Sequence, residues 1–281
     1  MTKVLITGAN GYIGSHVVNE FLKLKDTEIS VVDFKNDNIN QSVKYFNIDI
    51  LNEAGSDSLY KQLNSPDVVV HLAWQDGFNH NAESHLANLN KHYQFLKNMI
   101  DSGCKNINVM GTMHEVGYYE GEIKDETPCR PQSLYGISKN ALRQAISLYI
   151  RDKDISLKWL RAFYILGDDV KNKSVFTKIL QFEKKGKETF PFTDGKNKYD
   201  FIKVDELARQ IAMSSIQNNV VGIINCCSGN PVTLKEKVEE FIEENNLKIR
   251  PQYGVFPSRL YDSPAIWGNT DKIESIVRRT K

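Results

Sequence analysis

Long hydrophobic runs are missing from this sequence. The apolar stretch nearest the N-terminus, Val4-Leu5-Ile6, is followed at once by polar and glycine residues. It is too short for a secretory leader, and no run approaches the roughly 18 apolar residues of a membrane-spanning helix. We therefore expect a cytoplasmic protein that does not associate with a membrane.

An excess of charge of either sign is also missing. The chain has 36 Lys and Arg residues against 35 Asp and Glu residues, so its formal net charge is +1. Proteins that bind nucleic acid usually carry a basic surplus, so nucleic acid is not an expected partner.

Cysteine is scarce and shows no metal-ligand spacing. The four cysteines include no CxxC pair, and Cys226 and Cys227 are adjacent. Neighbouring side chains of a strand point to opposite faces, which suits neither a disulfide nor a shared metal ion. We expect reduced structural thiols and no metal site.

The N-terminal end of the chain has a glycine-rich stretch instead. Lys3 to Thr7 is typical of a short buried strand, Gly8, Gly11 and Gly14 follow, and a helical apolar pattern begins at Val17. Such a turn lets backbone N–H groups approach a diphosphate, and the helix N-terminus adds partial positive charge. A turn made for packing alone is the alternative, but the position between strand and helix favours a dinucleotide site.

Segments rich in Val, Ile and Leu alternate with helical patterns over residues 1–165. Near-continuous apolar strands indicate a parallel sheet with helices on both faces. After the first, the expected strands are Glu28–Asp33, Lys44–Ile48, Asp67–Leu72, Asn106–Met110 and Lys158–Arg161. The sequence therefore predicts an α/β fold, a doubly wound parallel sheet of the Rossmann type.

An acidic residue follows the glycines at the distance typical of dinucleotide-binding folds. Asp33 ends the second strand, 19 residues after Gly14, where a carboxylate can accept hydrogen bonds from an adenosine ribose. A carboxylate there repels a 2′-phosphate and favours NAD, although the nearby Lys35 leaves NADP open. A helix cap or loop aspartate is the structural alternative.

The carboxyl ends of the next two strands should also line the ligand, because ligands of open α/β sheets bind there. These ends hold Asp49-Ile50 and His71-Leu72-Ala73, in which we interpret His71 as a packing residue. A helix is expected from Ala82 to Asp101. Three histidines are interpreted as surface or interface residues: His80, His85 and His92.

Thr112, Tyr135 and Lys139 form the candidate catalytic group. Thr112 follows the fifth expected strand, and Tyr135 and Lys139 are four residues apart, so they share one face of a helix. A neighbouring ammonium favours the phenolate of a tyrosine, whose pKa is otherwise about 10. An ordinary amphipathic surface is the alternative, but the dinucleotide stretch upstream disfavours it.

Taken together, the glycine stretch, Asp33, His71-Leu72-Ala73, Thr112 and the Tyr135/Lys139 pair resemble the extended short-chain dehydrogenase/reductase family, in its sugar-nucleotide epimerase/dehydratase branch. The resemblance implies that Tyr135 exchanges a proton with the substrate and that Thr112 hydrogen-bonds the reacting oxygen. Lys139 would bind the nicotinamide ribose and lower the tyrosine pKa. A homodimer is also implied, as is a cofactor site made of Gly8, Asn10, Gly11, Tyr12, Ile13, Gly14, Asp33, Asp49, Ile50, Leu72, Ala73, Trp74, Asn88, Tyr135 and Lys139.

The C-terminal part breaks the alternation of strands and helices. We expect residues 1–165 to form the dinucleotide-binding domain, to which the chain returns at about 199–228, and residues 166–281 to form a smaller, interwoven substrate lobe. Arg259 lies among aromatic and turn residues and suits a diphosphate clamp, with a surface cation as the alternative. The resemblance implies substrate contacts from Thr112, Met113, His114, Tyr164 and Arg259.

Three functions are compared. The first is NAD(P)H-dependent reduction of the C4 ketone of a nucleotide-linked 4-keto-6-deoxy sugar for bacterial surface polysaccharide. The segments 112–117 and 259–268 resemble bacterial deoxysugar reductases, including those that make dTDP-D-fucose, and favour this reading. The second is a C4 epimerase that uses NAD catalytically; a 4,6-dehydratase is disfavoured because Met113 and His114 replace the family's Asp-Glu pair. The third, a non-enzymatic dinucleotide sensor, would not need the candidate catalytic group.

Overall fold

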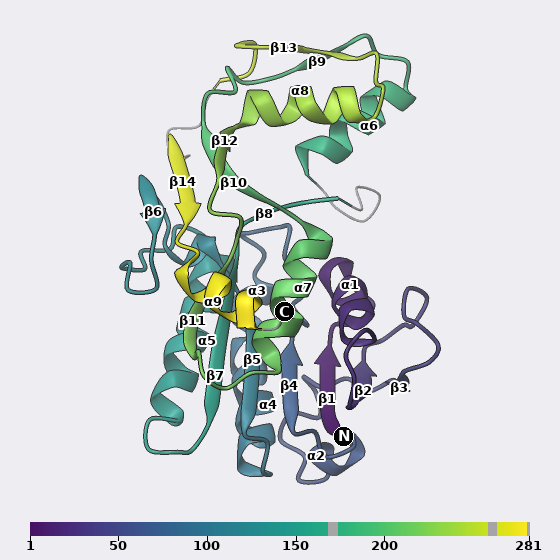
Figure 1. Ribbon diagram of the computed structural model, residues 1–281, viewed down its shortest axis with the longest axis vertical. Coiled ribbons are helices and arrows are strands. Elements are labelled where there is room, and N and C mark those ends of the chain that lie inside the picture. The colour runs from purple at the N-terminus through teal and green to yellow at the C-terminus, as the bar shows by residue number, and fades with distance from the viewer. Residues whose placement is uncertain (168–173, 258–262, 280–281) are drawn as a thin grey trace.

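The computed structural model describes residues 1–167, 174–257 and 263–279 of the chain. Its larger part is a sheet flanked by helices, and a smaller lobe around α6 and α8 lies beyond the carboxyl ends of the sheet strands (Figure 1). Within the described residues, none of the helices combines the length and the apolar character needed to cross a membrane.

The seven strands of the main sheet run parallel. Their spatial order is β11-β7-β5-β4-β1-β2-β3. Strand β1 pairs with β2 on one side and β4 on the other, so the winding reverses there, and the predicted doubly wound fold is confirmed. The strands are β1 (Thr2–Thr7), β2 (Thr27–Val32), β3 (Lys44–Phe46), β4 (Val68–His71), β5 (Asn106–Thr112), β7 (Ser156–Ala162) and β11 (Gly222–Cys226).

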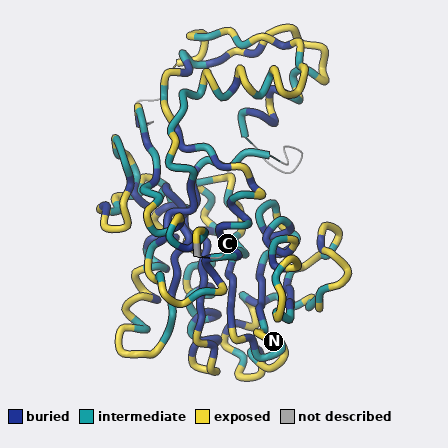
Figure 2. The backbone as a smooth tube through the Cα atoms, in the orientation of Figure 1, coloured by how far each residue is buried: buried dark blue, intermediate teal, exposed yellow. Residues whose placement is uncertain are grey.

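Helices cover both faces of this sheet, so alternate residues of β1 enter two different cores. Val4 and Ile6 pack with α1, α7 and α9, whereas Leu5 packs with α2, α4 and α5. Burial on both faces explains the continuous apolar strands, which are dark blue in Figure 2. The helices are α1 (Tyr12–Phe21), α2 (Leu59–Gln62), α3 (Ser84–Ala87), α4 (Leu89–Asp101), α5 (Leu134–Tyr149), α7 (Val204–Ser215) and α9 (Asp271–Arg279).

The helix expected from Ala82 to Asp101 is divided in two at Asn88. The Asn88 N–H donates to the Ser84 carbonyl at 3.0 Å, while the Asn88 carbonyl accepts from the N–H of His92. Asn88 therefore ends α3 and begins α4. A short 3₁₀ helix, η1 (Met113–Glu115), follows β5 directly.

The smaller lobe has a sheet and a core of its own. Its second sheet has the order β12-β10-β14-β6, with β8 also paired to β10, and β13 pairs with β9 at the far end. Phe176, Phe190 and Val238 belong to its separate hydrophobic cluster. The predicted domain limits stay a prediction. The elements are β6 (Gly121–Ile123), β8 (Tyr164–Leu166), α6 (Val175–Lys184), β9 (Thr189–Pro191), β10 (Lys198–Lys203), β12 (Pro231–Thr233), α8 (Leu234–Glu244), β13 (Arg250–Gln252) and β14 (Ala265–Gly268).

Candidate active site

The glycine turn after β1 is too closely packed for side chains. Gly8 has a φ of +70°, and a Cβ there would lie 2.6 Å from the backbone nitrogen of Ala73. A Cβ on Gly14 would lie 2.1 Å from the Gly8 carbonyl oxygen. Gly11 is the N-cap of α1 and offers no side chain to the first helical N–H groups. The turn therefore fits the predicted diphosphate, because backbone donors at a helix N-terminus are left for it.

Asp33 stands beside this turn as the first residue after β2. Its Oδ2 accepts from the Asn10 N–H at 2.9 Å, and its Oδ1 accepts from the Phe34 N–H at 2.7 Å. The carboxylate thus joins the end of β2 to the glycine turn at the edge where an adenosine ribose would lie. This position fits NAD, whose ribose carries a free 2′-hydroxyl.

Four further residues of the predicted cofactor site have partners within the chain. Asp49 accepts from two backbone N–H groups, at 3.1 Å each, and closes the turn after β3. Ile50 is buried in the core behind that turn. The Tyr12 hydroxyl donates to the Gly167 carbonyl at 2.6 Å, and Ile13 packs against the core. Their contacts with a cofactor stay a prediction.

The residues after β4 are fixed to β1. The N–H groups of Leu72 and Ala73 both donate to Thr7, to its carbonyl and its hydroxyl respectively, at 3.2 Å each. Nearby, the Asn88 side chain donates to Gln75 Oε1 at 3.0 Å. The segment therefore lies against the glycine turn, where the prediction places the cofactor.

Trp74 contacts both a histidine and the predicted catalytic lysine. Its ring stacks on His92 with centroids 4.3 Å apart, and Lys139 Nζ lies 3.8 Å from the Trp74 ring centroid. The Trp74 indole N–H donates to His85 Nδ1 at 3.0 Å. These contacts bring Trp74 to the candidate catalytic group, and its contact with a cofactor stays a prediction.

The prediction of surface or interface histidines is wrong for His85 and His92, which are each 1% exposed. His71, buried at the end of β4 as a packing residue would be, hydrogen-bonds His92 through Nε2 and Nδ1 at 2.9 Å. Burial lowers the pKa of His92 to about 3 and the pKa of His71 well below its usual range. Both rings are therefore neutral at pH 7. The sequence did not reveal the burial of His85 and His92 because the residues that contact them lie on other elements.

Tyr135 and Thr112 meet at the carboxyl end of β5. Their side chains lie close enough to interact, and the His80 ring stacks on Tyr135 with centroids 5.3 Å apart. Burial raises the pKa of Tyr135, the charge of Glu115 raises it further, and the interaction with Thr112 lowers it. The net shift is upward, so the phenol holds its proton at neutral pH.

Lys139 is buried one helical turn after Tyr135. Its Nζ donates to the Met110 carbonyl at 2.7 Å and lies 5.9 Å from the Tyr135 ring centroid. Burial lowers the pKa of Lys139 to about 7, and the charge of Glu115 opposes that decrease. The net shift of the Tyr135 pKa is upward, through burial and Glu115, and the lowering of that pKa by the Lys139 ammonium stays a prediction.

Glu115 is a residue that the sequence analysis missed. Thr112 accepts from the N–H of His114 at 3.3 Å, while the Glu115 carboxylate accepts from the N–H of Thr112 at 2.8 Å. This is a capping box, whose signature is a threonine followed three residues later by a glutamate. The Thr-x-x-Glu spacing was therefore the available signal.

The predicted substrate residues are placed unevenly. Met113 is buried, and His114 packs on His80 with ring centroids 4.4 Å apart; burial lowers the pKa of His114 to about 4. Tyr164 packs on Tyr199, with centroids 4.3 Å apart, at the base of the smaller lobe. Arg259 lies outside the described residues.

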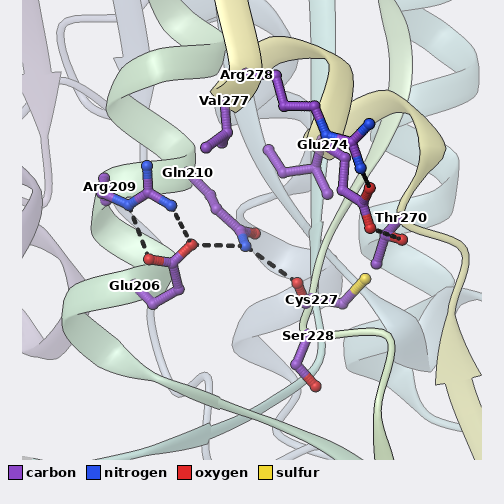
Figure 3. A pocket seen from close by; sticks show the side chains of 10 residues that line it. Glu206, Arg209, Gln210, Cys227, Ser228, Thr270, Glu274, Val277 and Arg278 are labelled. Atoms are coloured by element: carbon purple, nitrogen blue, oxygen red, sulfur yellow. Dashed lines mark hydrogen bonds and ion pairs between the residues drawn. The ribbon is translucent and has the colours of Figure 1, made fainter. Parts of the chain in front are cut away.

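A cavity of about 380 Å³ opens between α7 and α9, away from this group (Figure 3). Its cations are already paired, Arg209 with Glu206 and Arg278 with Glu274. None of the predicted site residues that the structure describes lines the cavity. It is therefore not the predicted site.

Comparison with known proteins decides the family. Residues 4–227 match the sequence model of the NAD dependent epimerase/dehydratase family. The chain belongs to this family. It is an NAD-dependent oxidoreductase of the extended short-chain dehydrogenase/reductase type, and the predicted cofactor and enzyme class are confirmed.

Two curated relatives act on deoxysugars joined to dTDP. The dTDP-6-deoxy-L-talose 4-dehydrogenase (NAD(+)) of Aggregatibacter actinomycetemcomitans is 46% identical, over 94% of this chain and 98% of the relative. The dTDP-4-dehydro-6-deoxyglucose reductase of Escherichia coli is 26% identical, over 84% and 79%. Among solved structures, the UDP-glucose 4-epimerase of Thermotoga maritima matches with a TM-score of 0.82 at 22% identity, over 98% of this chain and 92% of that one. This last likeness shows the fold.

Proposed function

We propose that this enzyme transfers a hydride between NAD and C4 of a dTDP-linked 6-deoxyhexose, interconverting a C4 hydroxyl and a C4 ketone. The observation that carries this proposal is the 46% identity to a dTDP-6-deoxy-L-talose 4-dehydrogenase over 98% of that enzyme. The name of that relative describes oxidation. The predicted C4 reduction is the same step in the opposite direction, so the two agree on the reaction.

The candidate catalytic group supplies the proton chemistry of this step. In the reductive direction Tyr135, which holds its proton at neutral pH, donates it to the C4 oxygen as the C–H bond forms; in oxidation it takes that proton back. Thr112 hydrogen-bonds the same oxygen. Bound NAD would supply the hydride acceptor for oxidation and, as NADH, the hydride donor for reduction. General acid–base catalysis of this kind contributes about 10²–10⁴-fold.

The remaining residues hold the cofactor. The glycine turn takes the diphosphate, and Asp33 takes the adenosine ribose. Lys139 binds the nicotinamide ribose. It lies one helical turn from Tyr135, so the ribose and the reacting oxygen can be held side by side. In this proposal Arg259 binds the substrate diphosphate.

A stoichiometric assay tests this function against the alternative, a C4 epimerase. Some relatives of the chain are named as epimerases, which favours keeping this alternative. The enzyme is incubated with NAD⁺ and dTDP-6-deoxy-L-talose, or with NADH and the C4-keto sugar. We expect one NADH formed or consumed per sugar, measured by nicotinamide absorbance. Sustained sugar interconversion without net change in NADH would promote the epimerase.

We also propose a homodimer in the cytoplasm. Ile137 and Leu148 are 41% and 61% exposed, and their spacing of eleven residues places them on one face of α5; Leu86 of α3 is 49% exposed. Exposed apolar side chains on packed neighbouring helices support a shared interface. Four free cysteines suit a reducing compartment. Sedimentation at micromolar concentration should give twice the chain mass, and a monomer at every concentration would refute the dimer.

A further inference from the structure

Glu115 lies at the junction between the catalytic threonine and the sheet. It is 0% exposed, and its Oε1 accepts from both the Thr112 N–H and the Trp159 indole N–H, each at 2.8 Å. The space for this arrangement depends on Gly111, where a Cβ would lie 2.2 Å from Trp159 Nε1 and 2.9 Å from Glu115 Oε1. The carboxylate therefore fixes the backbone from which the Thr112 hydroxyl projects.

The second oxygen of Glu115 has no hydrogen-bond partner. It lies 3.6 Å from Arg161 Nη2 and 4.0 Å from Arg143 Nε, and Arg161 is itself 0% exposed. Burying a carboxylate costs several kcal/mol in desolvation, and pairing with the buried Arg161 cation offsets part of that cost. The pairing leaves Oε2 without a hydrogen bond, so it does not use the whole carboxylate.

The candidate catalytic pair lies within the field of this charge. Glu115 raises the pKa of Tyr135 and raises the pKa of Lys139 against the effect of burial. With Lys139 at about 7, that contribution decides how much of it is protonated at neutral pH. The titratable or charged groups around Glu115 are Arg161 of β7, Tyr135, Lys139 and Arg143 of α5, His114 of η1, and Cys129, whose Sγ lies 3.7 Å from Arg161 Nη2.

We propose that Glu115 is a positioning residue for the reaction: it fixes the Thr112 turn and places a buried negative charge beside the Tyr135–Lys139 pair. This rests on the proposed function. It adds a residue that touches neither substrate nor cofactor and acts through three residues that do.

Two variants separate the effect of the Glu115 charge from the effect of the length of its side chain. Glu115→Gln keeps an acceptor oxygen but removes the charge, so the pKa of Tyr135 and the pKa of Lys139 both fall. Deprotonation of Tyr135 in the oxidative direction and loss of the Lys139 cation then both occur at lower pH. We expect the whole kcat-against-pH curve, and the pH above which NADH affinity declines in calorimetry, to move down by about one unit.

Glu115→Asp keeps the charge but is too short to reach both donors. Its pH curve should stay in place while kcat falls about tenfold with an unchanged KM, because the Thr112 hydroxyl is misplaced. Trp159→Phe is the control, since it removes one donor to the same oxygen and leaves both the charge and the Thr112 bond. Its pH curve should match that of the unsubstituted enzyme.

The outcomes are distinguishable. An unchanged pH dependence of NADH binding in folded Glu115→Gln overturns the positioning proposal, whether or not the sugar reaction is found. If Glu115→Gln does not fold even with NAD⁺ present, Glu115→Asp decides: an unchanged kcat overturns the proposal. Failure of the proposed function would instead appear as no sugar-dependent NADH change in the unsubstituted enzyme.

Discussion

The sheet half and the smaller lobe are assembled from different kinds of contact. In the sheet half, β1 pairs with β2 after a single helix, and β1 places Val4 and Ile6 in the core on one face and Leu5 in the core on the other. In the lobe, the strands around the six-residue β10 have three or four residues each, and some pair over long separations, as when Gly121 of β6 meets Ile266 of β14. Every residue of the candidate catalytic group lies in the sheet half. The comparison teaches that the half specified by local patterns holds the candidate catalytic group, while a substrate-binding role for the lobe stays a prediction.

The largest expected effect follows from filling the glycine turn. In Gly14→Val the new Cβ would lie only 2.1 Å from the Gly8 carbonyl oxygen, which is too close for two non-bonded atoms. We expect loss of NADH binding by calorimetry, together with a lower melting temperature. Gly55→Ala is the control, because a Cβ at Gly55 meets nothing within 4 Å. Normal NADH affinity in Gly14→Val would contradict the assignment of the turn.

Removing one buried ring from each half sharpens the comparison. Phe95 is 0% exposed in the sheet half and Phe176 is 3% exposed in the lobe, so truncation of either to Ala should cost about 3–5 kcal/mol of unfolding free energy in urea. Phe95 lies 5.1 Å from His71, ring to ring, so Phe95→Ala should also weaken NADH binding. Phe176→Ala should raise the sugar KM and leave NADH affinity unchanged. Equal loss of NADH affinity in both variants would contradict the assignment of cofactor binding to the sheet half.

Tyrosine substitutions locate the chemistry. Tyr135→Phe keeps the ring but removes the acidic proton, so kcat should fall roughly 10²-fold or more, with NADH affinity retained. Tyr149→Phe, on the same helix, removes only a hydrogen bond to Asp101 and should leave kcat unchanged. Tyr164→Phe, at the base of the lobe, should change KM more than kcat. Steady-state kinetics checks all three, and a fully active Tyr135→Phe would reject the assigned role.

The smallest expected effect is a loss of stability in acid. All six histidines lie in residues 1–165, so this loss arises in the sheet half. The pKa of His92 is about 3 in the folded protein but about 6.5 in the unfolded chain. Its contribution is complete above pH 6.5 and is lost as pH falls toward 3, since the unfolded chain binds the proton first. At pH 5 the loss is about 2 kcal/mol. Urea unfolding at pH 7 and pH 5 should show this decrease, and His92→Gln should show a smaller one.

Local patterns predicted the elements that repeat along the chain. The predicted strand from Asn106 begins where β5 begins, and Gly8 and Gly11 lie between β1 and α1 as expected, while Gly14 lies in the first turn of α1. The division of the helix at Asn88 was missed, since one asparagine in a helical pattern carries little signal. The sequence also could not show that His85 and His92 are buried, because Trp74 and His71, which contact them, lie on other segments.

The sequence by itself determined the parallel sheet, the dinucleotide turn and the identity of the candidate catalytic residues, because each depends on spacings of a few residues within one strand, turn or helix. Only the tertiary structure decided the protonation of those residues. The pKa of Lys139 and the pKa of Tyr135 are set by burial and by Glu115, and the position of Glu115 depends on Trp159 and Arg161 of β7. Desolvation and Coulomb interactions act through space, so residues more than forty positions apart control one another only after the chain has folded.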